Sequence, residues 1–114
     1  MKASVVYIDD EPAICRIVQW RLEGAGLSVK CFTEPEAAIE WIERHPVRCI
    51  LCDQRMPSMS ALELRGRLDP ALPFWVVTGD LLLGPDATGR SDIRGVIHKP
   101  IDFDELVSLV GALD

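Results

Sequence analysis

Five polar residues close or follow short apolar runs at widely separated points of the chain. They are Asp9, Asp10, Asp53, Thr78 and Lys99. If these runs are parallel strands, their carboxyl ends meet at one edge of the sheet, where doubly wound α/β proteins place their chemistry. Three carboxylates, one hydroxyl and one ammonium would then share a single pocket.

Three carboxylates in one pocket repel one another, which indicates that a cation balances them. Mg²⁺ binds through oxygen ligands and keeps several waters, so it suits a site with only a few carboxylates. A divalent cation also neutralises charge on a transferring phosphoryl group, while a lysine adds positive charge and a threonine hydroxyl donates to a phosphoryl oxygen. Each residue alone is ordinary at a strand end, but the conjunction at four strand ends predicts phosphoryl chemistry.

Short β-rich runs alternate with amphipathic stretches along the whole chain. The first, third and fourth runs are almost wholly apolar, as expected for central strands, whereas the second alternates as an edge strand does. This order predicts an α/β fold with a doubly wound, five-stranded parallel sheet and helices on both faces. The expected strands are Val5–Ile8, Leu27–Phe32, Arg48–Cys52, Phe74–Thr78 and Gly95–His98.

The stretches between the runs carry helix start and stop signals. A first helix is expected from Glu11-Pro12 to the glycines at 24 and 26, and a second is expected to stop before Pro46. The inward stripe of the first helix is expected to be Ile14, Ile17, Val18 and Leu22. Capping-box spacings mark three later helix starts, at Thr33 and Glu36, Ser60 and Glu63, and Asp102 and Glu105.

Two interruptions shape the second half of the chain. The third helix is expected to end at Asp69-Pro70. The segment Leu81–Arg90 contains two glycines and a proline, so any helix there is expected to be short, broken or mobile.

Length and charge limit what kind of protein this is. The 114 residues fit one domain, 1–114, and a net charge of -6 argues against direct nucleic-acid binding, which needs clustered Lys and Arg. No apolar run approaches the roughly 18 residues of a membrane span, and no signal peptide is evident, so we expect a cytoplasmic protein without membrane contact. Cys49 and Cys52 form a C-x-x-C spacing inside a strand, where their sulfurs should point to opposite faces and hold no metal.

With these motifs in view, the chain resembles the receiver domains of two-component signalling from residue 5 to about residue 113. The motifs are I-D-D-E-P at 8–12, C-D-Q-R-M-P at 52–57, V-T-G at 77–79 and H-K-P at 98–100. The resemblance implies a flavodoxin-like strand order 2-1-3-4-5. It also implies that Asp53 accepts a phosphoryl group from the phosphohistidine of a sensor histidine kinase or phosphotransfer protein, or from a small acyl phosphate.

The resemblance assigns a role to each residue of the pocket. Asp10, Asp53 and the backbone carbonyl of Arg55 are implied to hold Mg²⁺, with Asp9 acting mostly through water. Lys99 and Thr78 are implied to bind the phosphoryl oxygens, assisted by the backbone N–H groups of Gln54 and Gly79, and the Lys99–Pro100 peptide is implied to be cis. Such a protein would catalyse its own phosphorylation and dephosphorylation and would not be a conventional metabolic enzyme.

The sequence departs from the family pattern at three places. Val96 stands where the family usually has an aromatic residue, whose side-chain rotamer changes on phosphorylation. Ala61 replaces a common glycine. The interrupted segment Leu81–Arg90 replaces a regular helix. Arg55 and Asp80, two residues beyond Asp53 and Thr78 respectively, are further expected to pair across the mouth of the pocket and slow dephosphorylation.

Two other functions compete with this interpretation. A degenerate receiver could act as a phosphorylation-independent protein-binding module. A haloacid-dehalogenase-type phosphatase also uses an aspartate nucleophile, but it needs a D-x-D pattern after its first strand, where this chain has the adjacent pair Asp9-Asp10. The motifs name neither the effector domain nor the output partner, and they fit a homodimer as well as a place within a longer protein.

Overall fold

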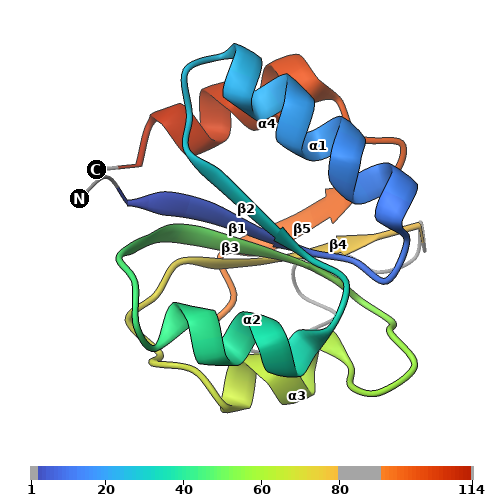
Figure 1. Ribbon diagram of the computed structural model, residues 1–114, viewed down its shortest axis with the longest axis vertical. Helices are drawn as coiled ribbons and strands as arrows, with labels where there is room; N and C mark the ends of the chain where they lie inside the picture. Colours follow the sequence, from blue (N-terminus) through green and yellow to red (C-terminus); the bar gives the residue numbers. More distant parts are fainter. Residues whose placement is uncertain (1–2, 80–90, 114) are drawn as a thin grey trace.

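The computed structural model describes residues 3–79 and 91–113, in which five parallel strands form one sheet (Figure 1). The strands lie in the order β2-β1-β3-β4-β5, which confirms the expected topology. Only β2 and β5 are edges, in agreement with the alternating pattern of the second run. The strands are β1 Ser4–Ile8, β2 Val29–Phe32, β3 Val47–Asp53, β4 Phe74–Thr78 and β5 Gly95–His98.

Two helical layers sandwich the sheet, as Figure 1 shows. Helices α1 (Pro12–Gly24) and α4 (Phe103–Gly111) cover one face, and α2 (Pro35–Ile42) and α3 (Ala61–Gly66) cover the other. Successive residues of β1 therefore enter different cores: Val5 packs in the α1 and α4 layer, and Val6 packs in the α2 and α3 layer. Both valines are fully buried, which explains why the central strands are apolar on both faces.

The capping signals hold at two of the three expected positions. Ser60 accepts from the Glu63 N–H in a complete capping box, and Asp102 accepts from the Glu105 N–H. The box expected from Thr33 to Glu36 is wrong, because Pro35 occupies an early helical position and the N-cap moves to Glu34, which makes no side-chain cap hydrogen bond. The third helix is also shorter than expected, since it ends at Gly66 and gives way to a turn before Pro70.

Helix α1 turns a different stripe to the core than expected. Cys15, Val18 and Leu22 are its buried residues, whereas Ile17 is 50% exposed. The inclusion of Ile17 in the inward stripe is therefore wrong. A cysteine is small enough to pack closely on the sheet and behaves as a hydrophobe, so Cys15 takes the inward position.

The two cysteines of the C-x-x-C spacing point into different layers, as expected from strand geometry. Cys49 packs in the α1 and α4 core and Cys52 in the α2 and α3 core, and both are free thiols. Burial raises the pKa of Cys49 to about 12, so this thiol stays protonated at neutral pH. Within residues 3–79 and 91–113, no helix has the length and apolarity to cross a membrane.

Candidate functional site

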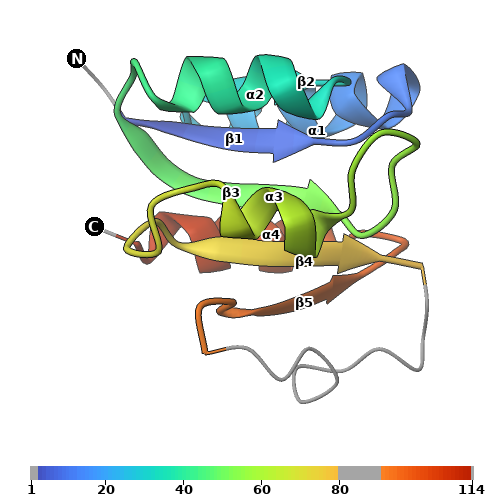
Figure 2. The same ribbon diagram turned by 90° about the horizontal axis from the view of Figure 1, so that it is seen from below.

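Parallel strands bring the predicted residues to one edge of the sheet. The strand arrows in Figure 2 point the same way, and the register aligns Ile8 with Cys52 and Thr78 with His98. The residues that close or directly follow these strands therefore lie side by side. The prediction that the strand ends converge is confirmed by this geometry.

Three carboxylates meet at this edge. Oxygen atoms of Asp9, Asp10 and Asp53 lie within 4.8 Å of one another. Asp9 is fully buried, Asp53 is half-buried and Asp10 is exposed, so one side of the cluster faces water. This donor set fits a small hard cation that keeps part of its water shell, because all three ligands are oxygens and one of them remains open to solvent.

Lys99 lies between two of the carboxylates. Its Nζ atom is 3.1 Å from Asp9 Oδ2 and 3.0 Å from Asp53 Oδ1. Burial raises the pKa of Asp53; the hydrogen bond from Lys99 opposes this rise, and the negative charge of Asp9 adds to it. Burial lowers the pKa of Lys99, but the hydrogen bonds and charges of Asp53 and Asp9 outweigh burial and leave that pKa above its ordinary value. The ammonium therefore stays protonated at neutral pH and balances part of the acidic charge.

The buried Asp9 carboxylate has two further partners, which the sequence analysis did not predict. The hydroxyl of Tyr7, itself fully buried, donates to Asp9 Oδ2 at 2.9 Å, and the Glu11 N–H donates to Asp9 Oδ1 at 3.0 Å. Burial and the neighbouring charge of Asp9 raise the pKa of the Tyr7 hydroxyl, which keeps its proton. A tyrosine within an otherwise aliphatic strand, two residues before an aspartate, is the pattern that could have indicated this contact, since residues i and i+2 share a face.

A small hollow lies beside Asp53. It has a volume of about 240 Å³ and is lined by Asp53, Gln54, Arg55, Thr78 and Gly79. The buried Thr78 hydroxyl donates to the Gln54 side-chain oxygen. The hollow therefore places a hydroxyl and a carboxylate beside a space large enough for a small anionic group.

One expectation about this hollow is not met. The Gln54 N–H donates to the Val77 carbonyl at 2.8 Å as part of the pairing of β3 with β4, so it does not face the hollow. Arg55 is exposed in the following loop, where its backbone pairs with Ser60. The Lys99–Pro100 peptide is cis, as the resemblance implied.

Other expectations fall outside the described residues or remain untested. Asp80, the proposed partner of Arg55, and the segment Leu81–Arg90 both lie in the range 80–90, which the structure does not describe. Val96 is half-buried in β5, in register with Val76. A larger hollow of about 590 Å³ lies between α1 and α4, so size alone does not locate the acidic cluster.

Comparison with known proteins agrees with the geometry. The family model for the response regulator receiver domain matches residues 5–111. The response regulator protein TodT of Pseudomonas putida is 35% identical over 117 residues, covering 97% of this chain and 51% of TodT. The phosphoglycerate transport system transcriptional regulatory protein PgtA of Salmonella typhimurium is 30% identical, covering 96% of this chain and 27% of PgtA. The chain thus spans about half, or less, of the length of these curated relatives.

Solved structures support the fold independently. The chemotaxis protein CheY4 of Vibrio cholerae superposes with a TM-score of 0.83 at 21% identity, covering 100% of both chains. The receiver domain of the Francisella response regulator 1452 gives a TM-score of 0.84 at 19% identity, covering 96% of this chain and 94% of that one. At these identities the likeness speaks for the fold alone, and the family follows from the sequence matches: the chain belongs to the response regulator receiver domain family.

Proposed function

We propose that this domain accepts a phosphoryl group on Asp53 and passes the signal on by changing its contacts with a partner. The observation that carries the proposal is the position of Asp53, whose Oδ1 atom lies 3.0 Å from the Lys99 ammonium in a cluster with Asp9 and Asp10. A lone carboxylate would need only solvent. Asp53 instead lies beside an ammonium and within a carboxylate cluster that fits a cation, and both positive charges would attract a phosphoryl donor.

In the proposed reaction a carboxylate oxygen of Asp53 attacks the phosphorus of a phosphohistidine. The bond from phosphorus to the imidazole nitrogen breaks, the leaving nitrogen keeps the electron pair, and an acyl phosphate forms on Asp53. The Lys99 ammonium, at hydrogen-bonding distance from Asp53, balances charge on the phosphoryl oxygens. The Thr78 hydroxyl, which donates to Gln54 in the resting site, donates to a phosphoryl oxygen instead. This exchange is possible because Thr78 and Asp53 line the same hollow.

Asp10, Asp53 and the backbone carbonyl of Arg55 would hold Mg²⁺, with Asp9 as an outer partner. When bound, the ion supplies positive charge to the phosphoryl oxygens and offsets the repulsion among the carboxylates. Hydrolysis of the acyl phosphate at the same site would return the domain to its resting state. Membership of the receiver family implies a histidine kinase or a phosphotransfer protein as the donor.

The test is phosphorylation with acetyl phosphate and Mg²⁺, read by intact-protein mass spectrometry. The wild type is expected to gain one phosphoryl group that is labile in acid and base, and Asp53→Asn is expected to gain none. Asp69→Asn, an equivalent change at an exposed loop position, should behave as the wild type. An undiminished adduct on Asp53→Asn would overturn the assignment, and no adduct on the wild type would favour a phosphorylation-independent binding module.

A further inference from the structure

Helix α1 carries apolar residues on two opposite sides. Its inward side, with Cys15, Val18 and Leu22, is buried on the sheet. Its outward side carries a second apolar row, in which Trp20 is 73% exposed and Ile17 is 50% exposed. A helix on the surface of a monomer normally presents polar residues there, so an exposed row of this kind indicates a contact surface.

The outward row has the geometry of a helix-pairing seam. We call it the outer stripe; it consists of Ala13, Ile17, Trp20 and Gly24. At about 100° per residue, these four positions span roughly 60° of the helix circumference. Their spacing of four, three and four residues is the one by which two helices interlock side chains. Alanine and glycine at the ends let a second helix approach, while the two large residues lie between them.

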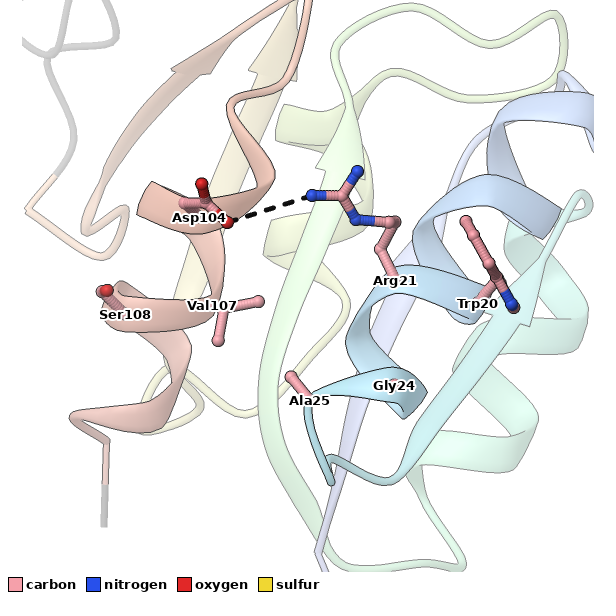
Figure 3. A pocket seen from close by; sticks show the side chains of 7 residues that line it. All are labelled: Trp20, Arg21, Gly24, Ala25, Asp104, Val107 and Ser108. Carbon is pink, nitrogen blue, oxygen red and sulfur yellow. Dashed lines mark ion pairs between the residues drawn. The ribbon is translucent and has the colours of Figure 1, made fainter.

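The neighbouring helix does not cover the outer stripe. Arg21 reaches across to α4, where it lies 3.9 Å from Asp104 and stacks over the Phe103 ring at 4.8 Å. Figure 3 shows Arg21 extended towards Asp104, whereas Trp20 projects from the opposite side of α1. Trp20 and Gly24 of the outer stripe also line the groove of about 590 Å³ between the two helices. The outer stripe therefore remains available to another molecule.

The charges beside the outer stripe indicate which molecule fits. Arg16 and Glu23 are both exposed and lie seven residues apart, on the same flank of the stripe at opposite ends of it. Gln19 donates to Glu23 at 3.3 Å on this flank. A complementary helix must carry an acid opposite Arg16 and a base opposite Glu23. The same helix in the antiparallel direction meets both requirements, because equal flanks face each other in an antiparallel pair.

We propose that two copies of this chain associate through their outer stripes, with α1 packed antiparallel on α1 about a two-fold axis. Ile17 of one copy then packs on Trp20 of the other, Ala13 faces Gly24, and Arg16 pairs with Glu23 of the second copy. The two-fold symmetry forms each of these contacts twice. The proposal is independent of phosphorylation at Asp53.

The size of the surface sets the expected affinity. Helix α1 has 13 residues and is therefore about 20 Å long. One helix pair of that length buries less than the roughly 1,200 Å² typical of stable complexes, so the dimer is weak and depends on concentration. Sedimentation velocity should show the wild type passing from monomer to dimer between about 10 µM and 1 mM.

The apolar part of the contact is tested by Trp20→Glu, which is expected to remain monomeric over the same range. Leu62→Glu is the matched control, since Leu62 is an exposed apolar residue on α3, across the sheet from α1. It should dimerise as the wild type does. A wild type that stays monomeric throughout, or equal loss of dimer in both variants, would overturn the proposal.

The antiparallel arrangement is tested by exchanging charges. Arg16→Glu and Glu23→Arg each turn two attractive pairs into two repulsive ones, and each is expected to weaken the dimer about tenfold. An equimolar mixture of the two variants should associate more strongly than either variant alone and approach the wild type, because only the mixed dimer restores both pairs. The doubly exchanged chain should also recover.

Arg44→Glu, at an exposed position in the turn after α2, is the control for the change in net charge and should leave the dimer intact. If the mixture of single variants associated no better than either variant alone, the outer stripe would not be pairing with itself in this direction. That result would leave a helix of a different protein as the occupant and would refute the proposal.

Discussion

Replacing Lys99 with methionine should expose how the charge of the resting site is balanced. Lys99 contacts Asp9 at 3.1 Å and Asp53 at 3.0 Å, and methionine keeps the apolar stem while removing the ammonium. At an effective dielectric constant of about 20, each contact has a gross Coulomb energy of about 5.5 kcal/mol. The cost of desolvating the ammonium offsets most of this sum.

The net loss can be bounded from burial. Removing one partner of a buried ion pair typically costs about 3–5 kcal/mol. The side chain of Lys99 is 22% exposed and that of Asp53 is 13% exposed, so water replaces part of the lost contact. We therefore expect Lys99→Met to lower the free energy of unfolding by about 3 kcal/mol at pH 7 in the presence of a chelator.

The loss should depend on pH at both ends of the range. The pKa of Lys99 is raised in the folded protein, so its contribution is complete below the unfolded value of about 10.4 and disappears as the pH rises through the folded value. The pKa of Asp53 is also raised, so protonation of Asp53 favours the folded state as the pH falls. Without the hydrogen bond from Lys99, the variant gains more from this protonation. The difference in the free energy of unfolding between the wild type and Lys99→Met should therefore become smaller at acidic pH and at alkaline pH.

Urea unfolding followed by tryptophan fluorescence measures these differences, since Trp75 is buried in the core. Lys30→Met, the same change at an exposed position of β2, is the control and should be nearly neutral. Addition of Mg²⁺ should stabilise Lys99→Met more than the wild type, because the cation replaces the missing positive charge. A loss below about 0.5 kcal/mol, or an equal loss in Lys30→Met, would refute this account of the site.

Three further substitutions test single contacts by the same unfolding measurement. Tyr7→Phe removes the hydroxyl that donates to Asp9 and should cost about 1.5–3 kcal/mol, the range for a hydrogen bond to a charged group. Gln54→Ala removes the acceptor of the Thr78 hydroxyl and should cost about 1 kcal/mol. Ser60→Ala breaks the capping box of α3 and should also cost about 1 kcal/mol.

Matched controls separate these contacts from general effects. Ser58→Ala changes an exposed serine of the same loop as Ser60, and Gln19→Ala changes a half-buried glutamine of α1 whose side chain hydrogen-bonds only the exposed Glu23 among the described contacts. Both should leave unfolding nearly unchanged. Tyr7→Phe with wild-type stability would mean that the buried Asp9 carboxylate does not depend on the hydroxyl, contrary to the geometry of the site.

The fold and the position of the acidic cluster could be predicted from the sequence because both depend on the periodicity of apolar residues. Central strands must be apolar on both faces, and the residues that end parallel strands must converge, so the sequence pattern alone predicts that Asp9, Asp53 and Lys99 lie together. Ile17 was misplaced because α1 has two apolar rows, and periodicity alone does not say which row faces the sheet. The choice depends on the fit of Cys15 against its neighbours.

The hydrogen bond from Tyr7 to Asp9 was not predicted, for a different reason. A tyrosine in a buried strand fits the core whether or not its hydroxyl finds an acceptor, so apolar periodicity alone does not indicate the bond; only the i, i+2 spacing to Asp9 points to it. The Thr33 capping box failed because the motif describes a spacing, while Pro35 fixes where the helix begins. The fixed φ of proline thus outweighs a capping-box spacing when the two signals disagree about the first residue of a helix.

The donors around Asp9 have a consequence for how the two adjacent aspartates tolerate replacement. Within residues 3–79 and 91–113, three donors hydrogen-bond to the Asp9 carboxylate: the Tyr7 hydroxyl, the Lys99 ammonium and the Glu11 N–H. Asparagine has the same shape but would direct its own N–H₂ group at one of these donors. Asp10, exposed to water, carries no such restriction. In a variant library selected for folding alone, position 9 should therefore remain aspartate while position 10 diversifies, and only selection for phosphorylation would restore Asp10.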